Sequence, residues 1–133
     1  MKSAVVDAHA LIWLAGQERR LGQRARRFFA AVERGQAVVC VPTVVLVEMG
    51  EASHRGRIVF PEGFEAWLER LALSPQHRIV DLTLAVVWRA QELYGIPERS
   101  DRLVAATAME LGCPVITGDA AIQASGKVAV LWD

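Results

Sequence analysis

The sequence predicts an α/β fold in which a mainly parallel central sheet lies between two layers of helices, a three-layer α/β/α arrangement. Two observations carry this prediction. Short apolar runs of strand length alternate along the whole chain with longer segments whose apolar residues recur at helical spacing. The clearest runs are continuously apolar, which is typical of parallel strands that are covered by helices on both faces.

The composition is that of a compact globular protein. The 133 residues, 53% hydrophobic and 23% charged, are expected to form a single domain over residues 1–133. Basic and acidic residues number 15 each, so no net charge draws the chain toward nucleic acid or a membrane. Two cysteines, Cys40 and Cys113, are too few for a zinc cage and are expected to be free thiols. Neither a membrane-spanning run nor a signal peptide is recognisable, so the expected location is the cytoplasm.

The first predicted strand and the first predicted helix meet at an acidic residue. Residues 4–6 form an apolar run, Asp7 ends it, and apolar residues at helical spacing begin with Leu11. Asp7 could serve only as the N-cap of this helix. Ligands of open α/β sheets bind just outside the carboxyl ends of the strands, so Asp7 is also a candidate site residue.

The next segments place a second carboxylate among apolar residues. An amphipathic helix is predicted over residues 22–34 and a buried strand over residues 37–41. Thr43 is the expected N-cap of a helix over residues 44–53. Glu48 lies inside that helix, where a carboxylate is costly unless a cation meets it, and this makes it a second candidate site residue.

The middle of the chain carries two helices and one strand. The pattern predicts an amphipathic helix over residues 61–73, a short strand over residues 78–82 and a helix over residues 84–94 that starts after Thr83. Asp81 is interpreted as a local capping residue, although it is a rival carboxylate for the site.

The last part of the chain repeats the alternation. A helix that ends at Leu111 is expected to be capped by Ser100 or Asp101, and a buried strand is predicted over residues 113–117. A short helix follows, and residues 128–131 are predicted to form the final strand.

Four carboxylates share a similar position relative to the predicted strands. Right-handed crossovers in a parallel sheet are expected to bring Asp7, Glu48, Asp101 and Asp119 to one edge. Carboxylates that are brought together repel one another, and hard cations such as Mg²⁺ or Mn²⁺, which prefer oxygen ligands, relieve that repulsion. A metal held in this way can activate water for attack on a phosphodiester. No nucleophile triad, phosphate-binding loop or Cys/His cluster competes with this interpretation.

Four segments together resemble the motifs of the PIN-domain family, and more narrowly of VapC-type toxins from bacterial toxin–antitoxin pairs. They are D-A-H-A-L-I-W at 7–13, V-L-V-E-M at 45–49, S-D-R-L-V-A-A-T-A at 100–108 and V-I-T-G-D-A-A-I at 115–122. The resemblance covers essentially the whole chain, including its length. It implies a parallel sheet with helices on both faces.

The resemblance also implies a Mg²⁺- or Mn²⁺-dependent endoribonuclease that acts as a toxin. Asp7, Glu48 and Asp101 match the core acidic positions of the family, Asp119 matches the fourth, and Thr117 matches a hydroxyl residue that orients the site. The implied partners are an RNA substrate, a cognate antitoxin whose tail fills a groove near the acids, and a second copy of the chain in a homodimer.

The chain departs from the family pattern at two places. Ala8 follows the first aspartate, where many relatives carry Thr or Ser. The acidic residue that often precedes the long last helix is displaced to Glu98. Whether Glu98, Glu51 or Asp81 joins the site is therefore left open, and Glu51 is expected to face solvent.

Several other residues have two interpretations. His9 is expected to be a packed, hydrogen-bonded residue, with an RNA contact or a proton shuttle as the alternative. Arg102 is expected either to contact an RNA phosphate or to pair with a site carboxylate. The four tryptophans are interpreted as core residues in preference to stacking platforms for bases: Trp13, Trp67, Trp88 and Trp132.

Two other classes of function are compatible with the sequence. One is a different α/β phosphoryl-transfer enzyme with Asp7 as the nucleophile, in which Lys127 would supply the lysine that such sites need. The other is a non-catalytic binding module whose acids are helix caps or a docking site for a basic peptide. Within the nuclease interpretation, transfer, ribosomal and messenger RNA are all compatible substrates, since surface loops and shape decide RNA specificity.

Overall fold

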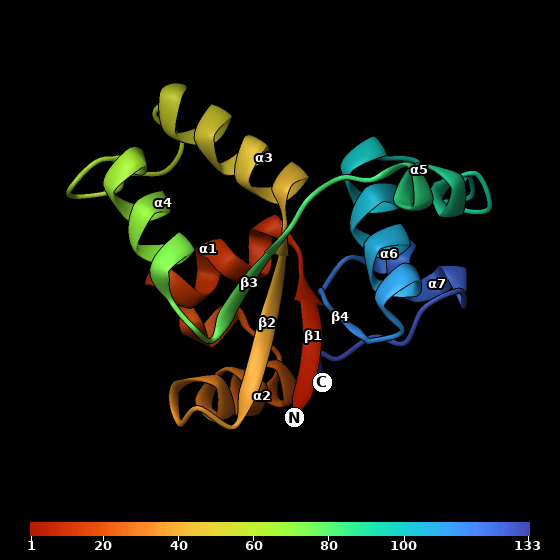
Figure 1. The fold of residues 1–133 in the computed structure, drawn as a ribbon, viewed down its shortest axis with the longest axis horizontal. Helices are drawn as coiled ribbons and strands as arrows, with labels where there is room; N and C mark the ends of the chain where they lie inside the picture. The colour runs from red at the N-terminus through yellow and green to blue at the C-terminus, as the bar shows by residue number, and fades with distance from the viewer.

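The computed structural model describes residues 1–133 and contains a four-stranded sheet flanked by helices (Figure 1). The strand order is β3-β2-β1-β4, and all three pairings are parallel. The strands are β1 (Lys2–Val6), β2 (Ala37–Pro42), β3 (His77–Val80) and β4 (Val115–Ile116). The predicted α/β fold with a parallel sheet is confirmed.

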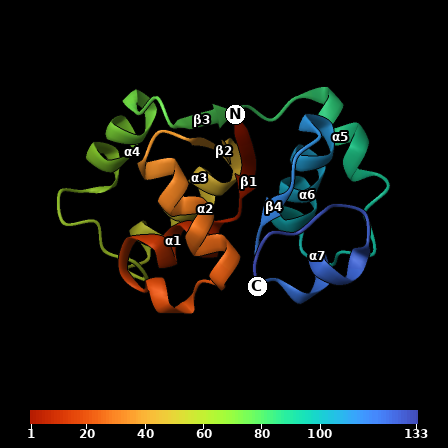
Figure 2. The same cartoon turned by 90° about the horizontal axis from the view of Figure 1, so that it is seen from below.

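Seven α-helices and one 3₁₀ turn connect and surround the strands. They are α1 (Ala8–Gly16), η1 (Glu18–Arg20), α2 (Gln23–Glu33), α3 (Thr43–His54), α4 (Phe64–Leu73), α5 (Leu84–Ala90), α6 (Arg99–Leu111) and α7 (Ala120–Ser125). In Figure 1, α1 to α4 lie to the left of β1, and α5 to α7 lie to its right. The view from below, Figure 2, shows the same separation, with helices on both sides of the central strands.

One continuous core holds these layers together. Thirty buried apolar residues form a single cluster, which includes most of β2 and the carboxyl half of β1. Helix α3 is rich in valine and therefore weak in intrinsic helix propensity, but it buries Val45 and Met49 against this core. Burial of each such side chain contributes about 1.5–3 kcal/mol, which outweighs the propensity cost.

The carboxyl-terminal segment closes the domain against the start of α2. The backbone N–H groups of Arg24 and Ala25 donate to the carbonyl oxygen of Trp132, at 3.0 and 3.1 Å. This carbonyl therefore caps a helix whose N-cap residue, Gly22, has no side chain to do so. The predicted final strand over residues 128–131 is wrong in extent, because only an isolated bridge between Val115 and Val130 forms.

Three predicted caps are also wrong. Thr43 is the first residue of α3 rather than its cap, and its hydroxyl accepts from the backbone N–H of Leu82 at 3.2 Å, which ties α3 to the segment after β3. Helix α6 begins at Arg99, so Ser100 and Asp101 lie in its first turn. Asp81 is exposed and caps nothing, because Thr83 caps α5.

The remaining differences concern boundaries and one aromatic residue. Helix α4 begins at Phe64, three residues later than predicted, after Gly63 with a φ of 93°. Helix α5 ends at Ala90 and gives way to turns. Trp88 is 73% exposed and is not a core residue, whereas the other three tryptophans pack against the core.

Cys40 and Cys113 are both free, as predicted, but only Cys40 is buried and Cys113 is partly exposed. None of the helices combines the length and the apolar run that crossing a membrane requires.

Candidate active site

The site begins where β1 and β4 end side by side. The register pairs Val6 with Ile116, so the residues that follow, Asp7 and Thr117, lie next to each other. The hydroxyl of Thr117 donates to Oδ2 of Asp7, and Oδ1 of Asp7 accepts from the backbone N–H of Ala10 at 2.9 Å. Asp7 is therefore both the N-cap of α1 and a buried carboxylate, 6% exposed, so the two interpretations of this residue are not exclusive.

The same hydroxyl organises the next acid. The backbone N–H of Asp119 donates to Oγ1 of Thr117 at 3.0 Å. The side chain of Asp119 caps α7 by accepting from the backbone N–H of Ile122 at 2.9 Å. A single oxygen atom of Thr117 thus contacts both the carboxylate of Asp7 and the backbone of Asp119.

The structure brings together the four acids that sequence reasoning selected. Glu48 lies in the second turn of α3, and Asp101 lies in the first turn of α6. Together with Asp7 and Asp119 they line one cavity of about 670 Å³. Four different segments supply these acids, and they are 112 positions apart at most, so only the parallel topology places them together.

Burial and mutual repulsion both disfavour the charged form of these acids. Burial, and then the carboxylates of Asp119, Asp7 and Glu48, raise the pKa of Asp101 to about 6. Burial raises the pKa of Asp7, and the hydrogen bonds from Thr117 and Ala10 oppose that rise. Burial also raises the pKa of Glu48, against the effect of the nearby Ser100 hydroxyl.

The donor chemistry of the cavity fits a hard divalent cation. All four acids offer carboxylate oxygens, and neither of the two ion pairs in the structure includes any of them. As the side chains stand, no group of three or more His, Cys, Asp or Glu residues is arranged to hold a metal ion. The residues present therefore fit Mg²⁺ or Mn²⁺ by their oxygen ligands and by their negative charge, which no ion pair neutralises. Their side chains do not converge on one point.

The three carboxylates that the sequence left open have different positions. Glu98 is the N-cap residue of α6, lines the acidic cavity and contributes to the raised pKa of Asp101. Glu51 is exposed, as expected, and lines a neighbouring groove. Asp81 lines neither cavity.

His9 is not packed as expected, and one of the two interpretations of Arg102, an ion pair with a site carboxylate, is not found. His9 is exposed rather than packed, and it lies at the rim shared by the acidic cavity and the groove. Arg102 donates to the carbonyl oxygens of Ile96 and Pro97, both at 2.8 Å, and covers the ring of Tyr94. Arg102 forms no ion pair with a site carboxylate and mainly braces the loop before α6.

Sequence reasoning missed two residues of the cavity wall. Ser100 was interpreted as a cap, but it lines the cavity beside Glu48. Arg20 was not singled out as a site residue, yet it lines the same cavity. The arginine-rich composition around residue 20 could not single it out, because the fold rather than local pattern decides which arginine turns toward the acids.

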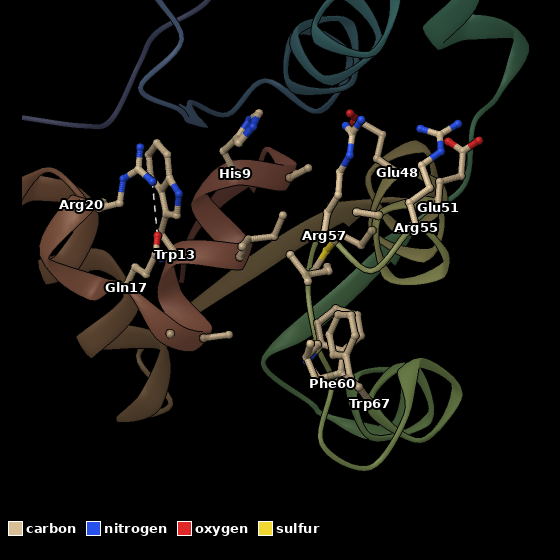
Figure 3. A pocket seen from close by; sticks show the side chains of 18 of the residues that line it. His9, Trp13, Gln17, Arg20, Glu48, Glu51, Arg55, Arg57, Phe60 and Trp67 are labelled. Carbon is tan, nitrogen blue, oxygen red and sulfur yellow. Dashed lines mark hydrogen bonds between the residues drawn. The ribbon is translucent and has the colours of Figure 1, made fainter.

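A larger groove of about 880 Å³ adjoins the acidic cavity (Figure 3). It lies between α1, α3 and the segment that leads into α4, and it shares His9, Trp13, Arg20 and Glu48 with the acidic cavity. Its far end is aromatic, with Phe60 and Trp67 in contact at a ring-centroid distance of 5.0 Å.

We expect the metal-free protein to lose stability as the pH rises between about 4 and 6. Asp101 has a pKa of about 6 in the folded state and an ordinary value of 3.8, so the folded state retains a proton that the unfolded state releases in this window. The free energy of unfolding then falls as the pH rises. Thermal unfolding in EDTA across this range tests it, and Asp101→Asn should flatten the dependence. A melting temperature that rises steadily through the window in the unaltered protein would contradict the repulsion described above.

The fold and the site define a class of protein: a parallel α/β domain with a cluster of five acids in a cavity at the carboxyl edge of its sheet. The chain belongs to the PIN-domain family, whose sequence profile matches residues 4–127. No protein of curated function matches the chain in sequence.

Solved structures share the fold over nearly the whole chain. A chain in the crystal structure of VapBC2 from Rickettsia felis, bound to a DNA fragment from its promoter, has a TM-score of 0.72 and 12% identity, with 98% of this chain and 99% of that chain covered. A chain of DNA-bound VapBC from Salmonella typhimurium has a TM-score of 0.70 and 16% identity, with 98% and 97% covered. VapC20 from Mycobacterium tuberculosis, described as a toxin that cleaves the sarcin–ricin loop, has a TM-score of 0.68 and 24% identity, with 96% and 98% covered.

Proposed function

We propose that the protein is a Mg²⁺- or Mn²⁺-dependent endoribonuclease and the toxin of a toxin–antitoxin pair. The observation that carries the proposal is the gathering of Asp7, Glu48, Asp101 and Asp119 in one cavity, where none of them forms an ion pair. Membership of the PIN-domain family supports it, because ribonuclease activity is known for that family.

The roles of the residues follow from their positions. Asp7, Glu48, Asp101 and Asp119 would hold the cation, which supplies activation of water and neutralises charge that develops on the phosphodiester. Thr117 would orient the carboxylate of Asp7 and fix the backbone of Asp119, whose own carboxylate accepts from the backbone N–H of Ile122. Burial of Asp7 limits the water around it, so its charge acts at short range with little screening.

The proposed partners are RNA, a cognate antitoxin and a second copy of the chain. The solved structures that share the fold include toxin–antitoxin complexes, which supports an antitoxin partner. The groove of about 880 Å³ beside the acids is large enough to receive a peptide segment. The proposal locates the protein in the cytoplasm, where RNA and antitoxin are found.

The alternative phosphoryl-transfer interpretation receives no support from the geometry. It requires a lysine near the nucleophilic aspartate, but Lys127 is exposed and lines a different cavity from the one that holds Asp7. Nothing in the cavity replaces that lysine except Arg20.

The purified protein is expected to cleave RNA from a pool of structured RNAs in Mg²⁺ or Mn²⁺ and not in EDTA. The same cations should raise its melting temperature, because they bind the folded state and relieve the repulsion among the four acids. Gel analysis of the RNA and thermal unfolding with a cation titration measure the two effects. The Glu48→Gln variant should lose both effects, and the Glu51→Gln variant, altered one turn further along α3, should retain them. Neither cleavage nor a cation-induced shift in the unaltered protein would favour a non-catalytic binding module instead.

A further inference from the structure

The acidic cavity has a single permanent cation in its wall. Of the residues that line it, Arg20 is the only lysine or arginine. It comes from the 3₁₀ turn η1, which directly follows α1. Arg20 also lines the neighbouring groove, so it stands at the junction of the two cavities. A polyanion that spans the groove and the acidic cavity would therefore lie close to this residue.

The position of Arg20 is set by stacking rather than by an ion pair. Its guanidinium carbon lies 4.4 Å from the centroid of the Trp13 ring, and its Nη1 donates to Oε1 of Gln17 at 3.3 Å. Figure 3 shows these three side chains together at one end of the groove. Trp13 is itself held by Trp132, at a ring-centroid distance of 5.9 Å. The guanidinium is thus preorganised by an aromatic surface.

The guanidinium keeps most of its hydrogen-bonding capacity free. Arginine carries five N–H donors, and the contact with the Gln17 side chain is the only hydrogen bond that the guanidinium of Arg20 makes within the protein. The ion pairs of the structure are Arg70–Glu62 and Arg89–Glu110, so Arg20 is not neutralised by the site carboxylates. A preorganised cation with free, planar donors fits an oxyanion such as phosphate, whose oxygens can accept from two parallel N–H groups.

We propose that Arg20, stacked on Trp13, binds a backbone phosphate of single-stranded RNA at the junction of the groove and the acidic cavity. The inference rests on the proposed ribonuclease function and identifies a substrate-binding residue for it. The acids attract cations and repel RNA, so the cavity needs a fixed positive group to hold a phosphate near them. RNA is favoured over an acidic peptide as the ligand of Arg20. In the proposed reaction a phosphate must lie beside the acids, and Arg20 lines the same cavity as those acids.

RNA binding measured without cleavage tests the proposal. A fluorescent single-stranded uridine oligonucleotide is titrated with the Asp7→Asn protein in EDTA, with and without Arg20→Gln, over a series of salt concentrations. Arg20→Gln is expected to weaken binding about tenfold, because a charge-assisted hydrogen bond is lost. It should also lower the slope of log Kd against log salt by about 0.7, the value for one phosphate contact with a single strand. Arg20→Lys should give an intermediate loss, since it keeps the charge but not the planar donors.

Arg19→Gln is the matched control. Arg19 is exposed in the same turn and lines neither cavity, so its removal should leave the affinity and the salt slope nearly unchanged. Equal effects of the Arg19 and Arg20 substitutions would overturn the proposal and leave the ribonuclease function intact. If the unaltered protein neither cleaved nor bound RNA under any condition, both the ribonuclease function and the role of Arg20 would be wrong.

A competition experiment separates RNA from an acidic protein partner. A polyglutamate peptide with the same number of negative charges should displace the oligonucleotide poorly, because its carboxylates do not reproduce the spacing of RNA phosphates. The peptide could instead bind as tightly as the RNA and lose affinity in the Arg20→Gln variant but not in the Arg19→Gln variant. Arg20 would then belong to an interface with an acidic protein, and the proposal would be wrong.

Discussion

Replacement of Asp7 by asparagine is expected to reduce RNA cleavage by on the order of 10³-fold without unfolding the protein. The substitution removes the most buried of the carboxylates that line the acidic cavity. Asparagine keeps an oxygen that can accept from the backbone N–H of Ala10, and asparagine and aspartate are about equally good N-caps. Because burial raises the pKa of Asp7, its charge costs stability in the metal-free protein, so the melting temperature in EDTA should stay the same or rise.

The measurement pairs a cleavage rate with two melting temperatures, one in EDTA and one in Mn²⁺. The unaltered protein should be stabilised by Mn²⁺, and the Asp7→Asn variant should not. Asp81→Asn provides the control, because Asp81 is an exposed aspartate outside both cavities. Full cleavage activity in Asp7→Asn, or an equal loss in Asp81→Asn, would exclude the assigned role of the cavity.

The Gly22→Ala substitution is expected to have the second large effect, a loss of folding stability. A Cβ atom at Gly22 would lie 2.1 Å from the carbonyl oxygen of Trp132, which is a backbone atom and cannot turn away. That carbonyl caps the first turn of α2, so the clash displaces the cap as well. We expect a loss of about 2–4 kcal/mol from strain and lost hydrogen bonds, which lowers the melting temperature by about 10 °C. The backbone at Gly22 has a φ of −64°, so the cause is steric crowding and not conformational strain.

Gly16→Ala is the matched control for thermal unfolding. Gly16 ends α1, and a Cβ atom there would meet no atom within 4 Å. Its replacement by alanine should leave the melting temperature unchanged or slightly higher, since alanine is the better helix former. A Gly22→Ala variant as stable as Gly16→Ala would show that the carboxyl-terminal segment does not brace α2.

Sequence reasoning succeeded where a single local pattern carries the information. The strands β1 and β2 and the helix α2 were predicted to within one or two residues, and the end of α6 at Leu111 was predicted correctly. The apolar pattern of these segments is strong, and glycine or proline marks the ends of β2, α2 and α6. Sequence reasoning failed for helix caps and for the final strand at the edge of the sheet. Thr43 has the right chemistry for a cap, but its hydroxyl bonds to the backbone of Leu82, a partner 39 residues away.

The exposed surface was the other source of error. Trp88 has the hydrophobicity of a core residue, yet it lies on the outer side of α5. Helical spacing places residues on a face, but it does not say whether another element covers that face. The final strand was reduced to one bridge for a related reason, because the segment instead uses Trp132 to cap α2 and to pack on Trp13.

The sequence by itself determined the fold class and the identities of the four acids, since strand–helix alternation and acidic residues beside apolar segments are local signals. Only the tertiary structure decided which other groups meet those acids. Ser100, Glu98 and Arg20 line the cavity because α6 and η1 are brought to the edge of the sheet by long-range packing. The hydrogen bond from Thr117 to Asp7 spans 110 residues and depends on the register of β1 and β4. The strength of the interactions within the site depends on such distances and on burial. Neither the distances nor the burial can be read from the order of residues along the chain.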